Sequence, residues 1–273
     1  YLTTMILRVN RKIIVVKYGG SAMVDEDLKN SVIQDVTLLK LVGFKPIIVH
    51  GGGKEISHWV EKSGKEAEFV NGLRKTDAET MEIAEMVLGR IGKSLVTMVE
   101  KLGVAAISIS GKDGGLLKVQ KKLSGGEDIG YVGEVEKVDT GILEDLLEQG
   151  YVPVIAPIGV GDGGESYNIN ADYVAAEIAG ALQAEKLLLL TDIEGIYKDF
   201  NDKSSFISTL HLPEARQYIK KGIIAGGMIP KVEACLTALE QGAGKTHIID
   251  GRLAHSIILE IFTSRGIGTQ VVR

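Results

Sequence analysis

Short apolar runs that end in glycines and lead into helical patterns recur along this chain. The run 12–17 is rich in β-branched residues, does not alternate with polar residues, and is followed by two glycines. The run 46–50 has the same character and is followed by three glycines. Unalternating runs of this length are typical of strands that are covered on both faces, as in a parallel sheet. The sequence therefore predicts an α/β fold.

Helical patterns lie between these runs. In residues 25–42 the apolar positions recur at three- and four-residue spacing, which predicts an amphipathic helix. Thr76 and Glu79 have the spacing of a capping box, which predicts that a long helix begins at Thr76. Residues 116–138 predict a surface hairpin. The further strands are expected at 104–108, 131–138, 151–155, 186–190 and 246–249, and the further helices at 53–62, 142–148, 171–182, 213–221 and 230–241.

Strand and helix alternate to the end of the chain, without an internal repeat, a low-complexity segment or a Pro/Ser-rich linker. This organisation predicts a three-layer αβα sandwich with a mainly parallel, open central sheet. We expect one domain with two lobes, of about residues 1–160 and 161–273, that meet near residues 156–170. Ligands of open parallel sheets bind beyond the carboxyl ends of the strands, where the glycine clusters fall.

The composition argues against several classes of protein. The 273 residues carry 31 basic and 36 acidic side chains, a net charge of −5, so nonspecific binding to nucleic acid or to an anionic membrane is not expected. The apolar runs are too short to cross a membrane, and the first residues lack the pattern of a signal peptide. A single cysteine, Cys235, and five histidines without ligand spacing predict neither a disulfide nor a metal site within the chain. We therefore expect a cytoplasmic protein.

Two common nucleotide-binding motifs do not fit this sequence. The Gly-Lys-Ser at 92–94 and the Gly-Lys-Thr at 244–246 lack the upstream glycine of a Walker A loop. After the glycine cluster 51–53, Ile56 occupies the position where a dinucleotide-binding loop has its third glycine. A P-loop enzyme and an NAD-dependent enzyme are thus disfavoured.

Two glycine clusters instead follow two strands, and Lys17 lies at the end of the first strand. Successive glycine amides can form a nest that binds an anion, and the missing Cβ atoms allow a phosphate to approach closely. We interpret the two clusters and Lys17 as a phosphate-binding site. The alternative is that the glycines only make tight turns between strand and helix. The glycines concerned are Gly19, Gly20, Gly51, Gly52 and Gly53.

Lys231 and Asp172 both fall in the first turn of a predicted helix. A lysine at the positive end of a helix is mildly unfavourable, but a bound polyanion reverses the sign, because helix amides and ammonium group then bind the same phosphate. Asp172 follows the predicted N-cap Asn170, and near two lysines its carboxylate would hold both ammonium groups in place. The alternatives are a solvated lysine and an acid that only stabilises its own helix.

Two further polar residues suit the recognition of an acidic small molecule. Arg74 lies just before a predicted helix and could bind a carboxylate through two parallel hydrogen bonds. Asn168 offers a side-chain amide for the backbone groups of an α-amino acid. The alternative for Arg74 is an ordinary surface arginine.

These motifs, taken in order, resemble the amino acid kinase family, and within it the members that phosphorylate the side-chain carboxylate of N-acetyl-L-glutamate in arginine biosynthesis. The resemblance implies an open αβα fold, with the acyl substrate on the N-terminal lobe and ATP on the C-terminal lobe. It covers nearly the whole chain and rests on Lys17-Tyr-Gly-Gly20, His50-Gly-Gly-Gly53, Gly72-Leu-Arg74, Gly111-Lys-Asp-Gly114, Asn168-Ile-Asn-Ala-Asp172, Leu190-Thr-Asp192, Gly227-Met-Ile-Pro-Lys231 and Gly266-Ile-Gly-Thr269.

The resemblance also implies a role for each matching residue. Lys17 and Lys231 would stabilise the transferring phosphoryl group, and Asp172 would organise the two lysines. Magnesium would be carried mainly by the phosphates of ATP. The residues expected to hold N-acetylglutamate are Gly52, Gly53, Arg74 and Asn168. The residues expected to flank the nucleotide are Gly19, Gly20, Thr191, Asp192, Gly195 and Tyr197.

The implied chemistry needs no general base. A γ-carboxylate has a reference pKa of about 4.3 and is already ionised at neutral pH. Cations and backbone amides that position both substrates and compensate their charge should therefore suffice for in-line transfer of the phosphoryl group.

The C-terminal part resembles the arginine-inhibited members of the family. His247, Glu260 and Gly266 match the positions that would hold the inhibitor. The resemblance implies a homodimer or a hexamer built as a trimer of dimers, and it leaves a PII-type regulator open. The alternatives for the activity are an aminoadipate-type, aspartate, carbamate or uridylate kinase, or a nucleotide and arginine sensor without catalysis. We expect no nucleic-acid or membrane partner.

Overall fold

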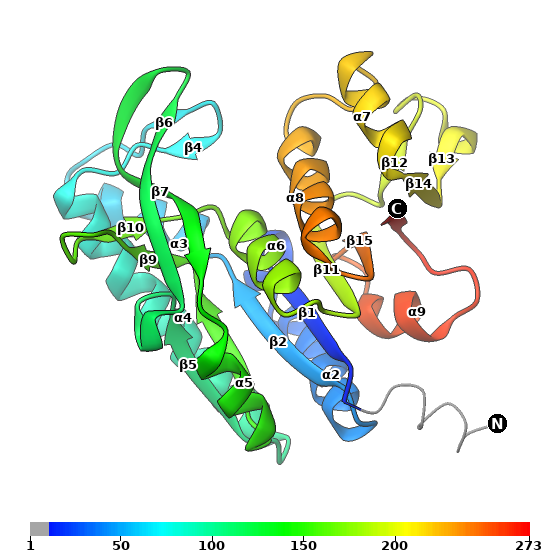
Figure 1. The fold of residues 1–273 in the computed structure, drawn as a ribbon, viewed down its shortest axis with the longest axis horizontal. Helices are drawn as coiled ribbons and strands as arrows, with labels where there is room; N and C mark the ends of the chain where they lie inside the picture. The colour runs from blue at the N-terminus through cyan, green and yellow to red at the C-terminus, as the bar shows by residue number, and fades with distance from the viewer. Residues whose placement is uncertain (1–10) are drawn as a thin grey trace.

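A computed structural model of the chain describes residues 11–273, so the first ten residues of the predicted N-terminal lobe lie outside the described part (Figure 1). Its centre is an eight-stranded sheet with the order β14-β16-β15-β11-β1-β2-β8-β5. All neighbouring strands are parallel except β15 and β16, which confirms the predicted mainly parallel sheet. The strands are β1 (Ile13–Tyr18), β2 (Lys45–His50), β5 (Ala106–Ser110), β8 (Val152–Ala156), β11 (Lys186–Thr191), β14 (Thr209–His211), β15 (Lys245–Asp250) and β16 (Thr269–Val272).

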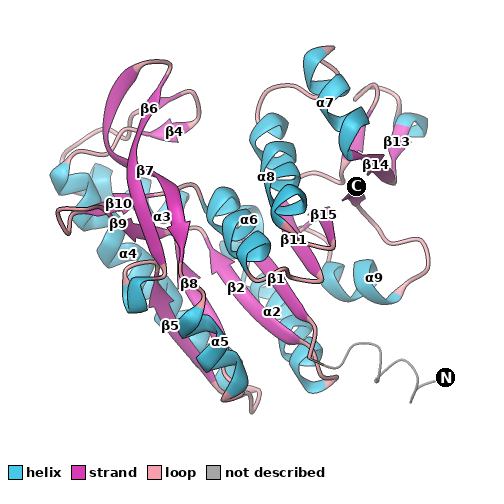
Figure 2. Ribbon diagram, in the orientation of Figure 1, coloured by secondary structure: helices cyan, strands magenta, loops and turns pink. Residues whose placement is uncertain are grey.

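Helices cover both faces of this sheet (Figure 2). Within β1, Val15 belongs to a core that includes side chains of α5, α6, α7 and α8, whereas Ile14 and Val16 belong to a second core with α2, α3, α4 and α9. Burial on both faces explains why the run 12–17 does not alternate, and the predicted three-layer sandwich is confirmed. The helices are α2 (Glu26–Leu41), α3 (Gly53–Lys62), α4 (Ala78–Lys101), α5 (Gly141–Glu148), α6 (Ala171–Ala181), α7 (Leu212–Lys220), α8 (Met228–Gln241) and α9 (Ser256–Phe262).

A small four-stranded barrel adjoins the central sheet. It consists of β6 (Leu117–Ser124), β7 (Glu127–Val138), β9 (Ile158–Val160) and β10 (Ser166–Asn168). The hairpin predicted at 116–138 is present with one exposed face, while Leu117, Val119 and Val132 on its other face are buried. Strands β9 and β10 were not predicted, since three residues are too few to establish a period.

Several short elements complete the described part of the chain. Two-residue strands pair as β3 (Phe69–Val70) with β4 (Leu73–Arg74) and as β12 (Ile196–Tyr197) with β13 (Phe206–Ile207). Short 3-10 turns form η1 (Gly20–Met23), η2 (Asp113–Gly115) and η3 (Lys203–Ser205). Within residues 11–273, no helix combines the length and hydrophobicity needed to cross a membrane.

The N-cap of helix α4 lies one residue later than the predicted Thr76. It is Asp77, whose carboxylate accepts a hydrogen bond from the backbone N–H of Thr80 at 2.8 Å. Thr76 instead pairs with β7, the second strand of the barrel hairpin. Its N–H donates to Ile129 O at 2.8 Å, and its carbonyl accepts from Tyr131 N at 2.7 Å. This tertiary pairing holds Thr76 outside the helix, so the predicted capping residue was wrong.

The strand order brings the predicted site segments to one edge of the sheet. Strand β1 lies between β2 and β11, with Lys17 in register with Val49 on one side and with Leu189 on the other. The carboxyl ends of these three parallel strands therefore meet, and the loops that follow them lie side by side. In Figure 1 this edge lies between the barrel hairpin on one side and α7 and α8 on the other.

Candidate active site

Lys17, Asp172 and Lys231 form a buried ionic cluster at this edge. Lys17 is the penultimate residue of strand β1, Asp172 lies in the first turn of α6, and Lys231 lies in the first turn of α8. One carboxylate oxygen of Asp172, Oδ1, is 3.0 Å from Nζ of Lys17, and the other, Oδ2, accepts a hydrogen bond from Nζ of Lys231 at 2.9 Å. The side chains of Asp172 and Lys17 are 7% and 11% exposed. Thus three residues from distant parts of the sequence lie within direct contact.

The position of Asp172 follows from its helix terminus. The side chain of Asn170 caps α6 and accepts a hydrogen bond from Asp172 N at 2.9 Å, as predicted for the N-cap. Burial raises the pKa of Asp172, but the positive charges of Lys17 and Lys231 outweigh it and hold the pKa below its usual value. The carboxylate is therefore ionised at neutral pH and unsuited to act as a general base.

Two cavities meet at this cluster. The first, of about 510 Å³, is lined by Asp172 and by the loops after β1 and β2. The second, of about 580 Å³, is lined by Lys231 and by the loop after β11. Lys17 and Gly20 line both cavities, so the two cavities adjoin at these residues.

The first cavity contains the predicted substrate residues Gly52, Gly53, Arg74 and Asn168, together with Gly19. Among the residues that the structure describes, the backbone N–H groups of Gly19, Gly20, Gly52 and Gly53 donate to no backbone or side-chain acceptor. Close packing requires glycine at position 52, because a Cβ there would come within 2.8 Å of Ile91 and 2.9 Å of Leu88. The two clusters thus bring unpaired amide donors to a cavity, as an anion nest requires.

Arg74 lines the first cavity and keeps one donor unpaired. Its Nη2 donates to Gly53 O at 2.8 Å and to Ser57 Oγ at 2.9 Å, and its guanidinium lies over the ring of Phe69 at 4.7 Å. Its Nη1 is buried and has no partner among residues 11–273. Burial lowers the pKa of Arg74, but a guanidinium keeps its proton in proteins. A buried cation with an unpaired donor suits a carboxylate ligand. The supporting residue Ser57 was not predicted, because no sequence motif marks it.

The predicted nucleotide residues Thr191, Asp192, Gly195 and Tyr197 line the second cavity. Asp192 Oδ1 accepts a hydrogen bond from Ser21 N at 2.8 Å, which links the loop after β11 to the loop after β1. Thr191 Oγ1 accepts from Ile193 N at 3.1 Å. These two side chains therefore hold the loops that surround the cavity.

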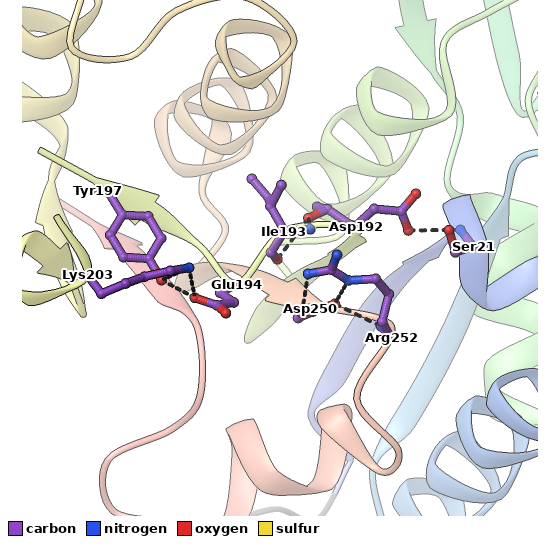
Figure 3. Close-up of polar contacts among 9 residues, drawn as sticks. Ser21, Asp192, Ile193, Glu194, Tyr197, Lys203, Asp250 and Arg252 are labelled. Atoms are coloured by element: carbon purple, nitrogen blue, oxygen red, sulfur yellow. Dashed lines mark hydrogen bonds and ion pairs between the residues drawn. The ribbon is translucent and has the colours of Figure 1, made fainter. Parts of the chain in front are cut away.

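The rest of the second cavity is largely apolar. Phe200, Ile223, Ile224 and Met228 contribute to its lining. At its rim the hydroxyl of Tyr197 donates to Glu194, which also binds Lys203 Nζ at 2.9 Å (Figure 3). An apolar cavity that opens onto lysines and glycine amides suits a molecule with a flat base and a polyanionic tail.

The residues predicted to bind arginine also lie together, but they line neither of the two cavities. His247 Nδ1 donates to Glu260 Oε1 at 2.6 Å, while the other oxygen accepts from Ile267 N at 2.6 Å and Gly268 N at 3.0 Å. A Cβ on Gly266 would come within 2.6 Å of the same carboxylate. Burial lowers the pKa of His247. The three residues form one buried cluster, and their predicted role in binding arginine stays a prediction.

The cluster of Lys17, Asp172 and Lys231 can compensate negative charge at the junction of the cavities. Two ammonium groups and four glycine amides are donors suited to phosphoryl oxygens. Within residues 11–273, no group of three or more His, Cys, Asp or Glu side chains is arranged to hold a metal ion.

Comparison with known proteins gives a consistent result. The profile of the amino acid kinase family matches residues 12–250. An acetylglutamate kinase of Thermoanaerobacter pseudethanolicus is 56% identical over 261 residues, which cover 95% of this chain and 87% of the relative. An acetylglutamate kinase of Moorella thermoacetica is 55% identical over 270 residues, covering 96% and 91%.

Solved structures share the fold. The N-acetylglutamate synthase of Neisseria gonorrhoeae, complexed with coenzyme A and N-acetyl-glutamate, superposes with a TM-score of 0.87 at 26% identity and covers 100% of this chain and 62% of its own. Carbamate kinase of Giardia lamblia bound to AMP-PNP superposes with a TM-score of 0.69 at 15% identity, covering 96% and 98%. At that identity the second likeness concerns the fold alone.

Proposed function

The chain belongs to the amino acid kinase family, and on that premise we propose that it is an ATP-dependent kinase that phosphorylates the side-chain carboxylate of N-acetyl-L-glutamate in arginine biosynthesis. The observation that carries the proposal is the carboxylate of Asp172, which holds Lys17 and Lys231 where two cavities meet. The identity of more than half of the aligned residues to acetylglutamate kinases supports the choice of substrate.

The first cavity would hold N-acetylglutamate. The free Nη1 of Arg74 and the side chain of Asn168 would bind its α-carboxylate and acetamido groups, which leaves the γ-carboxylate to face Lys17. With a reference pKa of about 4.3, the γ-carboxylate is ionised at neutral pH, so no proton has to be removed from the nucleophile. The absence of a general base from the proposed mechanism follows from this chemistry.

The second cavity would hold MgATP, with the base among the apolar side chains and the phosphates toward Lys231 and Gly20. One γ-carboxylate oxygen would attack the γ-phosphorus in line, while the bond from that phosphorus to the β,γ-bridging oxygen breaks. The products are N-acetylglutamyl 5-phosphate and ADP, and the leaving electron pair stays on ADP. Magnesium enters as part of the nucleotide substrate.

The two lysines and the glycine amides would act where negative charge accumulates. Lys17 borders both cavities and would compensate charge on the oxygens between the substrates, whereas Lys231 would compensate charge toward the leaving ADP. Asp172 would keep both ammonium groups charged and in place, and it would take no part in proton transfer. Donors fixed before the reaction lower the barrier most, because they need not reorganise in the transition state.

A substrate panel tests the proposal. ADP release in a coupled assay is measured with N-acetylglutamate, glutamate, aspartate, an acylated aminoadipate, carbamate and UMP. We expect turnover with N-acetylglutamate and at least about 100-fold lower kcat/KM with glutamate, aspartate, carbamate and UMP, because they leave Arg74 or Asn168 unpaired. The acylated aminoadipate keeps both groups, so its extra methylene should lower kcat/KM by about 10–200-fold. Turnover with another acceptor identifies another kinase of the family, and calorimetric binding of ATP without ADP release identifies a sensor.

Regulation by arginine is a separate proposal. It rests on the cluster of His247, Glu260 and Gly266, with Nζ of Lys186 3.4 Å from His247 Nε2. Arginine in the same assay should inhibit turnover, and Glu260→Gln should abolish inhibition. Oligomeric assembly as a homodimer or hexamer, and binding of a PII-type regulator, are proposals that sedimentation of the protein alone and with the regulator tests.

A further inference from the structure

His50 is a buried histidine that neither substrate would touch. It ends strand β2, directly before the glycine cluster, and its side chain has no exposed surface. Its Nδ1 lies 3.1 Å from the carbonyl oxygen of Gly51. A carbonyl oxygen can only accept, so Nδ1 carries the proton and donates.

This hydrogen bond determines the direction of the next backbone amide. Gly51 N–H donates to Tyr18 O at 2.9 Å, so both polar backbone groups of Gly51 are engaged. The described residues contain no cis peptide bond, so the N–H of Gly52 points opposite to the Gly51 carbonyl. With the carbonyl bonded to His50, the N–H of Gly52 is turned away from His50, and Gly52 lines the first cavity.

The other ring nitrogen, Nε2, does not help to stabilise the fold. Nε2 is buried and has no hydrogen-bond partner among the described residues. It faces Gly92 of α4, where a Cβ would come within 3.2 Å of Nε2 and 2.5 Å of Ser108 Oγ. A buried, unpaired polar atom is unfavourable. The useful group of the ring is therefore Nδ1–H.

The ring keeps this donor at any working pH. Burial lowers the pKa of His50 to about 4, against a smaller opposite effect of the hydrogen bond to Gly51. The imidazole is thus neutral around pH 7, and the Gly51 carbonyl requires the proton on Nδ1.

We propose that His50 is a positioning residue for phosphoryl transfer, whose Nδ1–H holds the Gly51 carbonyl so that Gly52 N–H donates to the transferring phosphoryl group. The inference rests on the proposed kinase function. An amide aimed at charge that develops during the reaction acts mainly on kcat. Loss of the Nδ1 donor should therefore lower kcat and leave both KM values nearly unchanged.

The test compares two polar substitutions that differ in where they place a donor. In His50→Asn the side-chain amide nitrogen takes the place of Nδ1, whereas in His50→Gln it takes the place of Nε2. We expect His50→Asn to keep kcat within about threefold of the parent, and His50→Gln to lose about tenfold or more, with KM for both substrates within about threefold. Ser108→Ala, which alters the Nε2 side of the same packing, is the matched control and should keep kcat.

Melting temperatures separate this role from a purely structural one. His50→Leu removes the donor but also the unpaired Nε2, so it should lose kcat like His50→Gln while keeping its melting temperature within a few degrees. Equal kcat for the Asn and Gln variants, whether retained or lost, would overturn the inference. An inactive parent protein in the same assay would instead refute the proposed function.

Discussion

Lys17 and Lys231 share one carboxylate, that of Asp172, at distances of 3.0 Å and 2.9 Å from its two oxygens. A strand end, a helix start and the first turn of a second helix supply the three residues. Each ammonium group keeps hydrogens that the single carboxylate does not use, because an ammonium group has three donors. The arrangement leaves a preorganised site of two ammonium groups with a net charge of +1, which suits a phosphoryl group.

Neutralising Asp172 should reduce both activity and stability. In Asp172→Asn the two lysines lose their shared countercharge, so their ammonium groups repel each other and move. We expect kcat to fall by about 100-fold and the free energy of unfolding, measured with urea at pH 7, to fall by about 3 kcal/mol, the lower end of the range for a broken buried ion pair.

The control for this substitution is Glu240→Gln. Glu240 pairs with Arg216 at the surface, where both side chains are about half exposed. An exposed pair contributes about 0–1 kcal/mol, so activity should be unchanged and stability nearly so. Equal losses in the two variants would contradict a special role for the Asp172 cluster.

Arg74 should determine the KM for N-acetylglutamate. Arg74→Lys keeps the positive charge but loses the planar fork, in which one nitrogen binds Gly53 and Ser57 while a second nitrogen stays available for a ligand. We expect KM for N-acetylglutamate to rise about 10–100-fold, the equivalent of one charge-assisted hydrogen bond, with KM for ATP unchanged. Steady-state kinetics with each substrate varied in turn checks this prediction. A rise in KM for ATP would contradict the assignment of Arg74 to the N-acetylglutamate cavity.

Gly195 should affect the nucleotide side. Its φ is +154°, and a Cβ there would come within 2.7 Å of Thr269 Oγ1 and 2.8 Å of Phe206. Gly195→Ala should therefore displace the loop that lines the second cavity and raise KM for ATP about tenfold, while KM for N-acetylglutamate stays constant. Gly103→Ala is the matched control, because Gly103 has φ +83° with no atom near the added Cβ. It should cost about 1 kcal/mol of stability and no affinity.

Asp77 should contribute a pH-dependent part of the stability. Hydrogen bonds from Lys65 and then from Thr80 lower the pKa of Asp77 to about 2. Because this pKa is below its unfolded value of about 3.9, the contribution is complete above about pH 4 and is lost as the pH falls toward 2.

Asp77→Ala removes this contribution and the N-cap of α4. It should lower the free energy of unfolding by about 1 kcal/mol at pH 7. Urea titrations of the parent and the variant from pH 7 to pH 3 should show the difference shrinking below about pH 4. A difference that grows toward acid would contradict the assignment of Asp77 as the ionised cap.

The sheet could be predicted from local patterns, whereas the smaller elements could not. The runs 12–17 and 46–50 are strands buried on both faces, so their composition alone revealed their place at the centre. Strand β16 was missed because it is a short strand antiparallel to β15, and helix α9 because it has only seven residues. The N-cap of α4 could not be predicted, because Thr76 pairs with a strand about fifty residues later and local sequence patterns do not report such a tertiary contact.

The candidate site, too, could be predicted only in part from the sequence. Sequence motifs predicted that Lys17, Asp172 and Lys231 meet, and the structure brings them into contact. Ser57 and His50 were not singled out, because their importance lies in what they hold: one side chain supports Arg74, and the other supports the Gly51 carbonyl. Supporting contacts of this kind depend on packing between elements that are remote in sequence.

The most direct test of the central claim measures kcat for ADP release in the parent, Lys17→Ala, Lys231→Ala and the double variant, with melting temperatures as a check of folding. If both lysines stabilise the same transferring phosphoryl group, each single variant should lose about 100–1,000-fold in kcat, and the double variant should lose less than the product of the two. Turnover retained near the parent level in either folded single variant would contradict the account.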